Sequence, residues 1–426
     1  MPLVALLVLT LLNSSLAGEE PPRIAIQAGR FLDVGKGVML ENQVIVINRN
    51  RILEVGSKEK VKIPEGAIVF DLSDATVLPG LIDLHTHLTS PHNIGTYESL
   101  GTSVAREALY GATHAKLTLE AGFTTVRNLG ASGYSDVALR DAVNAGELQG
   151  PRMQVSGPAI GITGGHCDNN LLPSEFQHKA EGVADGPWQI RAKVREVVKY
   201  GADVIKFCAT GGVLSKGTDV GATQYTLEEM TALIEEAHKL GRRVAAHAHG
   251  TEGIKFAIRA GVDSVEHASL LDEEAIAMAK KAGVALSMNL YSSQFIIQEG
   301  EKSGILPESI AKAMSVHDKR QQNFRRALAA GAFVVFSTDS GVFPHGQNAK
   351  QFSLMVRNGM TPLQAIQAAT IHAAKVMNWN KDIGSIEPGK FADLIAVMGD
   401  PLKDVTVLEK VGFVMKDGMV IRNDLK

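Results

Sequence analysis

Short apolar runs recur along this chain, and each is followed by a longer stretch with helical periodicity. Continuous apolar runs are typical of parallel strands that are buried on both faces, and helical stretches supply the crossovers that parallel pairing requires. The runs occupy residues 77–88, 122–130, 152–160, 203–210, 244–250, 264–269, 284–290 and 333–340. Eight such units predict an α/β fold of the (β/α)8 TIM-barrel type.

The helical stretch at 226–240 carries clear helix signals. Its apolar residues, at positions 230, 233, 234, 237 and 240, share one face. Thr226 and Glu229 have the spacing of a capping box, and Gly241 is placed to end the helix. A further helical stretch is expected over residues 361–377, after the last apolar run.

The pattern of apolar and polar residues is different near both ends of the chain. Residues 23–75 alternate apolar and polar side chains over short runs, which indicates antiparallel strands, and residues 384–400 and 410–423 return to strand texture. We therefore expect a small composite β-sandwich domain built from residues 18–76 and 381–426, with the barrel over residues 77–380 between them.

The first seventeen residues have the pattern of a signal peptide. An apolar stretch from Pro2 to Leu12 is followed by small and polar residues, and Ser15 and Ala17 fit an A-x-A cleavage site. This predicts cleavage after Ala17 and a periplasmic or secreted protein; the alternative is a disordered N-terminal tail. The stretch is shorter than the roughly 20 residues of a bilayer-spanning helix, and no later segment is apolar enough, so no membrane span is expected.

The charge and the cysteine content argue against a nucleic-acid-binding protein and against a disulfide-rich scaffold. The chain of 426 residues has 43 Lys and Arg against 46 Asp and Glu, a net charge of −3. Nucleic acid is not expected as a partner, because binding phosphates needs a concentrated basic surface. Cys167 and Cys208 are too few for a disulfide scaffold and leave one bridge or two free thiols open.

Metal-ligating side chains stand at the ends of several predicted strands. His85 and His87 are two residues apart in a strand, so both imidazoles point the same way. His247, His267 and Asp339 each fall at the carboxyl end of another predicted strand, the end at which TIM barrels carry their active sites. His267 alone would be read as a structural residue that satisfies a backbone carbonyl. Together the five residues predict a metal centre.

Lys206 lies inside the apolar run at 203–210, where an unpaired ammonium group would be expensive to bury. An ion pair with a neighbouring carboxylate would explain it. The other interpretation is that its amine has reacted with carbon dioxide to give a carbamate, an anionic ligand that can bridge two metal ions.

The motifs that surround these residues resemble those of the amidohydrolase superfamily, in the subgroup with a binuclear centre bridged by a carboxylated lysine. The resemblance is closest to the Xaa-Pro dipeptidase-like and imidazolonepropionase-like amidohydrolases. True imidazolonepropionases use one metal and lack the lysine, so Lys206 argues against that activity. The motifs extend over nearly all of the chain after residue 17: "LPGLIDLHTHL", "GFTTVRNLG", "TGGH", "VIKFCATGGVLS", "VAAHAHG", "SVEHAS", "STDSG" and "GSIEPGKFADL".

The resemblance implies two zinc ions. His85, His87 and Asp339 would hold the buried ion, His247 and His267 the more exposed one, and N6-carboxylated Lys206 would bridge both. His249 lies on the same strand face as His247, and we assign it a structural role because His247 matches the family's position. Imidazole and carboxylate are suitable ligands for zinc.

The implied mechanism is hydrolytic. Two metal ions lower the pKa of a bridging water to about 7, and Asp339 takes its proton and passes it to the leaving amine. His166 is placed to donate a hydrogen bond to the scissile carbonyl or to a substrate carboxylate, or else to cap a turn. Tyr225 and Arg127 are further candidates for binding a carboxylate; the alternatives are a packing role for Tyr225 and an internal salt bridge for Arg127.

The resemblance implies a binuclear zinc hydrolase that cleaves the amide bond of a dipeptide or N-acyl amino acid with a free carboxylate. A lactonase, cyclic amidase or phosphoesterase with the same centre is the first alternative, and a non-catalytic metal-binding scaffold is the second. Assembly into a homo-oligomer is left open.

Overall fold

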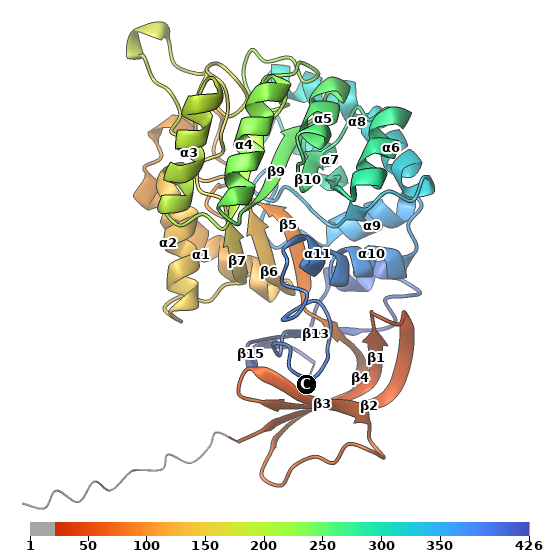
Figure 1. The fold of residues 1–426 in the computed structure, drawn as a ribbon. Coiled ribbons are helices and arrows are strands. Elements are labelled where there is room, and N and C mark those ends of the chain that lie inside the picture. Colours follow the sequence, from red (N-terminus) through yellow and green to blue (C-terminus); the bar gives the residue numbers. More distant parts are fainter. Residues whose placement is uncertain (1–21, 426) are drawn as a thin grey trace, which may run out of the picture.

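The computed structural model describes residues 22–425 and divides them into a small β-domain and a larger α/β domain (Figure 1). The predicted signal peptide, residues 1–17, and its cleavage site after Ala17 lie outside the described residues. Within the described part of the chain, no helix has the length and apolar character of a membrane span.

The β-domain combines strands from the two ends of the described chain. Its seven strands pair into one mixed sheet in the order β15-β14-β13-β4-β1-β2-β3, in which β1 and β4 are parallel neighbours and the other pairs are antiparallel. Ile26, Ile45, Leu394 and Phe413 belong to the core on this sheet. A β-sandwich consists of two packed sheets, whereas these seven strands pair into one sheet. The predicted β-sandwich therefore stays a prediction. The strands are β1 (Ile24–Asp33), β2 (Val38–Asn48), β3 (Arg51–Ser57), β4 (Ile68–Pro79), β13 (Leu394–Met398), β14 (Phe413–Lys416) and β15 (Met419–Asn423).

Each of the eight predicted apolar runs contains a strand of the α/β domain, and all pairings among these strands are parallel. They form two sheets, in the orders β5-β6-β7 and β12-β11-β10-β9-β8. Isolated parallel bridges join the two sheets, Thr86 with Ser340 and Ile160 with Phe207. The strands are β5 (Leu81–Thr86), β6 (Phe123–Asn128), β7 (Arg152–Val155), β8 (Val204–Cys208), β9 (Arg243–Ala248), β10 (Ser264–His267), β11 (Ala285–Ser287) and β12 (Val334–Val335).

The first predicted run, residues 77–88, does not form a single strand. It divides at Gly80: residues up to Pro79 belong to β4, which pairs with β13 in the β-domain, and β5 begins at Leu81. A Cβ at Gly80 would run into the Thr124 side chain, so this junction between the two domains requires glycine. A continuous apolar run gives no signal for such a change of sheet, because both strands are buried.

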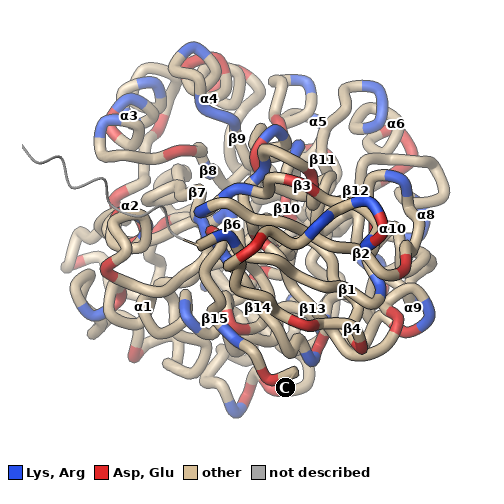
Figure 2. Tube along the Cα trace, turned by 90° about the horizontal axis from the view of Figure 1, so that it is seen from below, with Lys and Arg blue, Asp and Glu red and all other residues tan. Residues whose placement is uncertain are grey.

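Helices cover the outside of the parallel strands (Figure 1). The predicted helix at 226–240 forms as α4, with the capping box of Thr226 and Glu229, and the stretch at 361–377 divides into α10 and α11. The helices are α1 (Val104–Glu120), α2 (Ser135–Asn144), α3 (Pro187–Lys199), α4 (Leu227–Lys239), α5 (Thr251–Arg259), α6 (Glu273–Ala282), α7 (Leu290–Glu299), α8 (Pro307–Ala329), α9 (Lys350–Arg357), α10 (Pro362–Ala368) and α11 (Ile371–Val376). Seen from the side of the β-domain, basic and acidic positions are interspersed over the elements (Figure 2).

Candidate metal centre

All six predicted metal ligands line one cavity of about 350 Å³ at the carboxyl ends of the parallel strands. His85 and His87 come from the end of β5, and Asp339 follows β12. The other three lie one on each of three adjacent strands: Lys206 on β8, His247 on β9 and His267 on β10. Strand pairing therefore brings together side chains that are up to 254 positions apart in the sequence, from His85 to Asp339.

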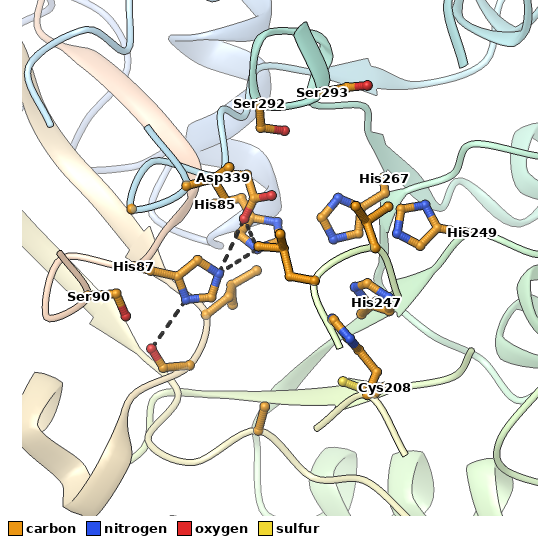
Figure 3. Close-up of a pocket in the computed structure, with 18 of the residues that line it drawn as sticks. His85, His87, Ser90, Cys208, His247, His249, His267, Ser292, Ser293 and Asp339 are labelled. Carbon is orange, nitrogen blue, oxygen red and sulfur yellow. Dashed lines mark hydrogen bonds and ion pairs between the residues drawn. The ribbon is translucent and has the colours of Figure 1, made fainter. Parts of the chain in front are cut away.

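The first cluster is made of His85, His87 and Asp339 (Figure 3). The two Nε2 atoms lie 3.2 Å apart, and Oδ1 of Asp339 lies 3.4 Å from Nε2 of His85 and 3.3 Å from Nε2 of His87. Ligands that surround zinc tetrahedrally at about 2.0–2.1 Å are separated from one another by about 3.3 Å. The three ligand atoms therefore fit one face of a zinc tetrahedron.

The second cluster, made of His247, His249 and His267, faces the first across the cavity (Figure 3). Its three ligand atoms lie within 4.8 Å of one another, and the ring centroids of His247 and His267 are 4.6 Å apart. The rings of His85 and His267 have centroids 5.2 Å apart, so the two clusters adjoin. His249 donates to or accepts from the Ser269 hydroxyl through Nδ1 at 2.8 Å. This contact fits the structural role predicted for His249.

Lys206 is buried beside both clusters. Its Nζ lies 3.5 Å from Nε2 of His85, and burial lowers its pKa to about 8, although Glu266 and Asp339 oppose this shift. Among residues 22–425 no carboxylate lies within ion-pair distance of Nζ, so the salt-bridge explanation for this lysine has no partner in the structure. An amine with a pKa near 8 is partly uncharged at neutral pH, and the uncharged amine is the form that reacts with carbon dioxide.

Burial keeps four of the clustered imidazoles neutral. It lowers the pKa of His85 to about 4 and holds those of His247, His249 and His267 well below the usual value, with nearby cationic groups acting in the same direction. The neutral imidazole is the form that binds a metal ion. Burial acts to raise the pKa of Asp339, but His85, His87 and Lys206 outweigh it and keep this carboxylate ionised. The donor set therefore fits divalent zinc.

Glu266 contacts His85 of the first cluster on the side away from the cavity, and Arg127 contacts Glu266. Oε2 of Glu266 accepts a hydrogen bond from Nδ1 of His85 at 3.0 Å, and Oε1 accepts one from the Arg127 guanidinium at 2.7 Å. Arg127 also donates to the Leu84 carbonyl oxygen and the Ser264 hydroxyl. The substrate-binding role predicted for Arg127 is therefore wrong: its donors are taken by the protein, and the alternative of an internal salt bridge is correct.

A buried carboxylate ties together the strands that carry the first cluster. Asp83, two residues before His85, accepts hydrogen bonds from the backbone N–H of His85 and Thr338 and from the side chain of Asn348. It also accepts one from the Thr338 hydroxyl, so β5 is fixed to the segment that carries Asp339. Burial raises the pKa of Asp83 to about 7.

Two of the predicted ligands have strained backbone. His267 and Asp339 have φ of +70° and +66°, a left-handed conformation that non-glycine residues seldom adopt and that costs about 1–3 kcal/mol. Gly341, with φ +112°, packs against His87, and a Cβ there would lie 2.9 Å from His87 Cβ. Such strain persists only where the surrounding structure enforces it, and functional sites are where it is usually found.

His166 lies at the cavity, where it stacks on His247 with ring centroids 4.0 Å apart. Its Nδ1 is 2.8 Å from the Ser215 hydroxyl, and burial lowers its pKa to about 3, with Lys206 acting in the same direction. A Cβ at Gly212 would collide with the His166 ring, so this glycine makes room for the stack. In the tautomer whose Nδ1 accepts from the Ser215 hydroxyl, this imidazole carries its proton on Nε2, which can then donate a hydrogen bond.

Tyr225 does not reach the cavity. Its hydroxyl donates to the Ala184 carbonyl oxygen at 2.7 Å, and its ring packs among buried side chains near Phe207. The prediction that Tyr225 binds a substrate carboxylate is therefore wrong, and the packing alternative is correct. The residue follows β8 in sequence as expected, but it turns toward the helical layer instead of the metal clusters.

Cys167 and Cys208 form a disulfide that lines the cavity. Of the two alternatives, one bridge or two free thiols, the bridge is therefore correct. Cys208 ends β8 two residues after Lys206, and Cys167 follows His166. The bridge therefore ties the His166 loop to the strand that carries Lys206.

Three residues that contact the clusters or line the cavity were not predicted from the sequence: Glu266, Asp83 and Arg320. For Glu266 and Asp83 a signal was present, because each is a charged residue inside an apolar run, the same reasoning that singled out Lys206. Arg320 lies on α8, whose residues carry several charged side chains, and nothing in that stretch distinguishes the one that faces the cavity.

Comparison with known proteins agrees with this geometry. The chain matches the amidohydrolase family over residues 76–421. Ochratoxinase from Aspergillus niger is 32% identical over 433 residues, which cover 96% of this chain and 88% of that protein. A crystal structure of a Xaa-Pro dipeptidase with methionine bound in the active site is 38% identical, with a TM-score of 0.89 over 93% of this chain and 99% of the other. A prolidase complexed with N-methylphosphonate-L-proline is 31% identical, with a TM-score of 0.86 over 94% of this chain and 100% of the other.

Proposed function

This chain belongs to the amidohydrolase family and is a hydrolase of amide C–N bonds, and from that premise we propose that it is a binuclear zinc enzyme. Its substrate in this proposal is a dipeptide or N-acyl amino acid with a free carboxylate. The observation that carries the proposal is the pair of adjoining ligand clusters with the buried Lys206 beside them. One cluster would suffice for a single metal ion; two clusters with a lysine support two ions.

The assignment of ligands follows the clusters. His85, His87 and Asp339 would hold one zinc ion, and His247 and His267 the other, with the carbamate of Lys206 bridging them. His249 is engaged by Ser269 and would support the second site from behind. This arrangement requires the two parallel sheets to form one closed barrel. The isolated bridges between the edges of the sheets support such a barrel.

The bound metal ions would lower the pKa of a water molecule and polarise the scissile carbonyl. The chain itself supplies the proton transfers and the orientation. Asp339, whose carboxylate is ionised, accepts the proton of the attacking water and delivers it to the leaving amine. His166 donates a hydrogen bond from Nε2 to the oxygen on which negative charge develops, and the stack on His247 fixes its direction.

The substrate class rests on the relatives. The dipeptidase structure holds an amino acid, methionine, in its active site, and the prolidase structure holds a phosphonate derivative of proline. The first of these relatives is named a Xaa-Pro dipeptidase and the second a prolidase. This supports the same class of substrate for the present chain.

We also propose a periplasmic or secreted location. The Cys167–Cys208 disulfide supports it, because structural disulfides persist in oxidising compartments, and the N-terminal residues have the pattern of a signal peptide.

The test is a substrate screen with the purified, zinc-loaded enzyme. The panel contains all dipeptides and a series of N-acyl amino acids, together with lactones, cyclic amides and phosphoesters, and it is run in parallel with Asp339→Asn. We expect hydrolysis within the dipeptide or N-acyl group and loss of at least about a hundredfold in kcat for the variant. Turnover confined to lactones or phosphoesters would replace the proposed substrate class. No turnover of any compound, or equal turnover by the variant, would contradict the proposal and favour a non-catalytic scaffold.

A further inference from the structure

Arg320, on helix α8, places a buried positive charge at the wall of the metal cavity. Its side chain is 3% exposed. Nε donates to the Ser269 hydroxyl at 2.9 Å, and Nη1 donates to the Asn289 carbonyl oxygen at 2.9 Å. Both acceptors are neutral, so the guanidinium is held in place without being neutralised.

The two fully buried arginines of the α/β domain that adjoin the site differ in this respect. Arg127 forms an ion pair with Glu266 at 2.7 Å, whereas no carboxylate among residues 22–425 lies within ion-pair distance of Arg320. Burial lowers the pKa of Arg320 to about 10, with Asp339 opposing the shift, so it remains charged at neutral pH. A buried charge without a counter-charge is costly, and it is expected where a ligand supplies the missing partner.

We propose that the Arg320 guanidinium binds the carboxylate of the substrate's C-terminal amino acid through Nη2, which has no hydrogen-bond partner among residues 22–425. This inference rests on the proposed amidohydrolase function and names the group that selects its substrate. Arginine is suited to the task because its planar fork matches a carboxylate and stays charged in a dry site.

The position of Arg320 agrees with this role. Ser269 links the guanidinium to His249, whose ring stacks on His267 with centroids 4.8 Å apart, so the anion site lies beside the second ligand cluster. In an N-acyl amino acid only three bonds separate the scissile carbonyl carbon from the carboxylate carbon. A substrate anchored at Arg320 would therefore present its amide to the metal clusters.

Apart from Arg320 and the hydroxyls of Ser292 and Ser293 on α7, the wall near α8 is apolar. Ile296 on α7, Ala313 on α8 and Val342 line the cavity on this side, and Ala313 lies two helical turns before Arg320. Apart from Lys206, Arg320 and Asp339, no side chain that lines this cavity is a lysine, an arginine or a carboxylate. The proposed substrate thus carries an apolar C-terminal side chain next to its bound carboxylate.

The test compares acids with amides, so that each protein serves as its own reference. The zinc-loaded full chain is assayed with N-acetyl-L-amino acids and with the matching carboxamides, and calorimetry measures the binding of the same compounds. The variants are Arg320→Met, which removes the charge, and Arg320→Lys, which keeps the charge and loses the fork. Arg325→Met, on the exposed side of the same helix, is the matched control. Thermal melts verify that each variant is folded.

We expect the wild type to favour at least one apolar acid over its amide by about 30-fold or more, in kcat/KM and in Kd, which is the scale of a buried charge pair. Arg320→Met should bring this ratio close to one, Arg320→Lys should retain part of it, and Arg325→Met should leave it unchanged. A wild-type ratio near one, or an undiminished ratio in a folded Arg320→Met, would overturn the inference while leaving amide hydrolysis intact. Failure to hydrolyse any amide would instead count against the proposed function, and the binding ratios would still decide the role of Arg320.

Discussion

The Glu266 carboxylate lies 3.0 Å from Nδ1 of His85 and directs the opposite nitrogen of that ring into the metal cavity. Both side chains are fully buried, and Arg127 fixes Glu266 from the other side at 2.7 Å. A carboxylate behind a ligand histidine sets its tautomer and raises the basicity of the nitrogen that binds the metal. Glu266 is thus a positioning residue for the first ligand cluster, although it does not itself reach the cavity.

Glu266→Gln should weaken zinc binding about 10- to 100-fold, because the amide cannot supply the negative charge behind His85. Competition with a chelator of known affinity measures the change in the zinc Kd. Glu54→Gln, an exposed position on β3, is the control and should match the wild type. Equal zinc affinity in Glu266→Gln and the wild type would contradict a positioning role.

Metal-free protein should lose stability steeply as the pH falls below about 6.5. The pKa of His85 is about 4 and that of His166 about 3, and those of His247, His249 and His267 are well below the usual value because of burial. Between pH of about 6.5 and about 4 the unfolded chain therefore binds more protons than the folded one, and each imidazole adds about 1.4 kcal/mol per pH unit to the loss.

Burial raises the pKa of Asp83 to about 7 and also raises those of Glu107, Asp136 and Asp393, which acts in the opposite direction. The imidazoles outnumber these carboxyl groups, because burial also lowers the pKa of His345, to about 3. Denaturant melts of the chelated protein at intervals from pH 5 to 7.5 measure the slope. A free energy of unfolding that stays level across this range would mean that the histidines are not held neutral by burial.

Removing the disulfide should destabilise the protein and disturb the His166 loop. The bridge joins residues 41 positions apart, for which the loss of chain entropy in the unfolded state corresponds to about 4 kcal/mol. We expect Cys167→Ala/Cys208→Ala to melt at a lower temperature and to show a lower kcat, since His166 adjoins Cys167. Thiol titration of the native wild type should find no free thiol. A double variant with unchanged Tm and kcat would show that the bridge neither stabilises the fold nor positions His166.

Gly341→Ala should disrupt the first ligand cluster. The added Cβ would approach His87 Cβ to 2.9 Å, and alanine at φ +112° is strained as well. Gly389→Ala separates these effects, because Gly389 has φ +90° but no atom within 4 Å of the place an added methyl would take, so it carries strain alone. Zinc content after dialysis should fall for Gly341→Ala and stay at the wild-type level for Gly389→Ala. If both variants keep their zinc, the contact with His87 does not matter for the site.

The residues of the two clusters could be predicted from the sequence because strand alternation and position suffice to place them. His85 and His87 share a strand face, and His247, His267 and Asp339 stand where their strands end, so parallel pairing brings them to one edge. The depth at which a side chain lies is harder to predict. Arg127 and Tyr225 are near the expected strand ends, but one turns inward beneath the cluster and the other outward into the helical layer.

Some contacts depend on how a helix or loop folds over the strands, and the sequence contains no pattern that predicts them. The Cys167–Cys208 bridge depends on the path of the loop after β7, and Arg320 reaches the cavity only because α8 packs across the ends of β10 and β11. Neither the spacing of the cysteines nor the charge pattern of α8 contains that information.

The most direct test of the central claim, two metal ions held by two clusters and bridged by modified Lys206, is an anomalous-difference map from crystals grown with zinc and bicarbonate. We expect two zinc peaks per chain, one at His85, His87 and Asp339 and one at His247 and His267, with carbamate density on Lys206 between them. In Lys206→Ala at least one peak should weaken or disappear. A single peak in the wild type, or two full peaks in Lys206→Ala, would contradict it.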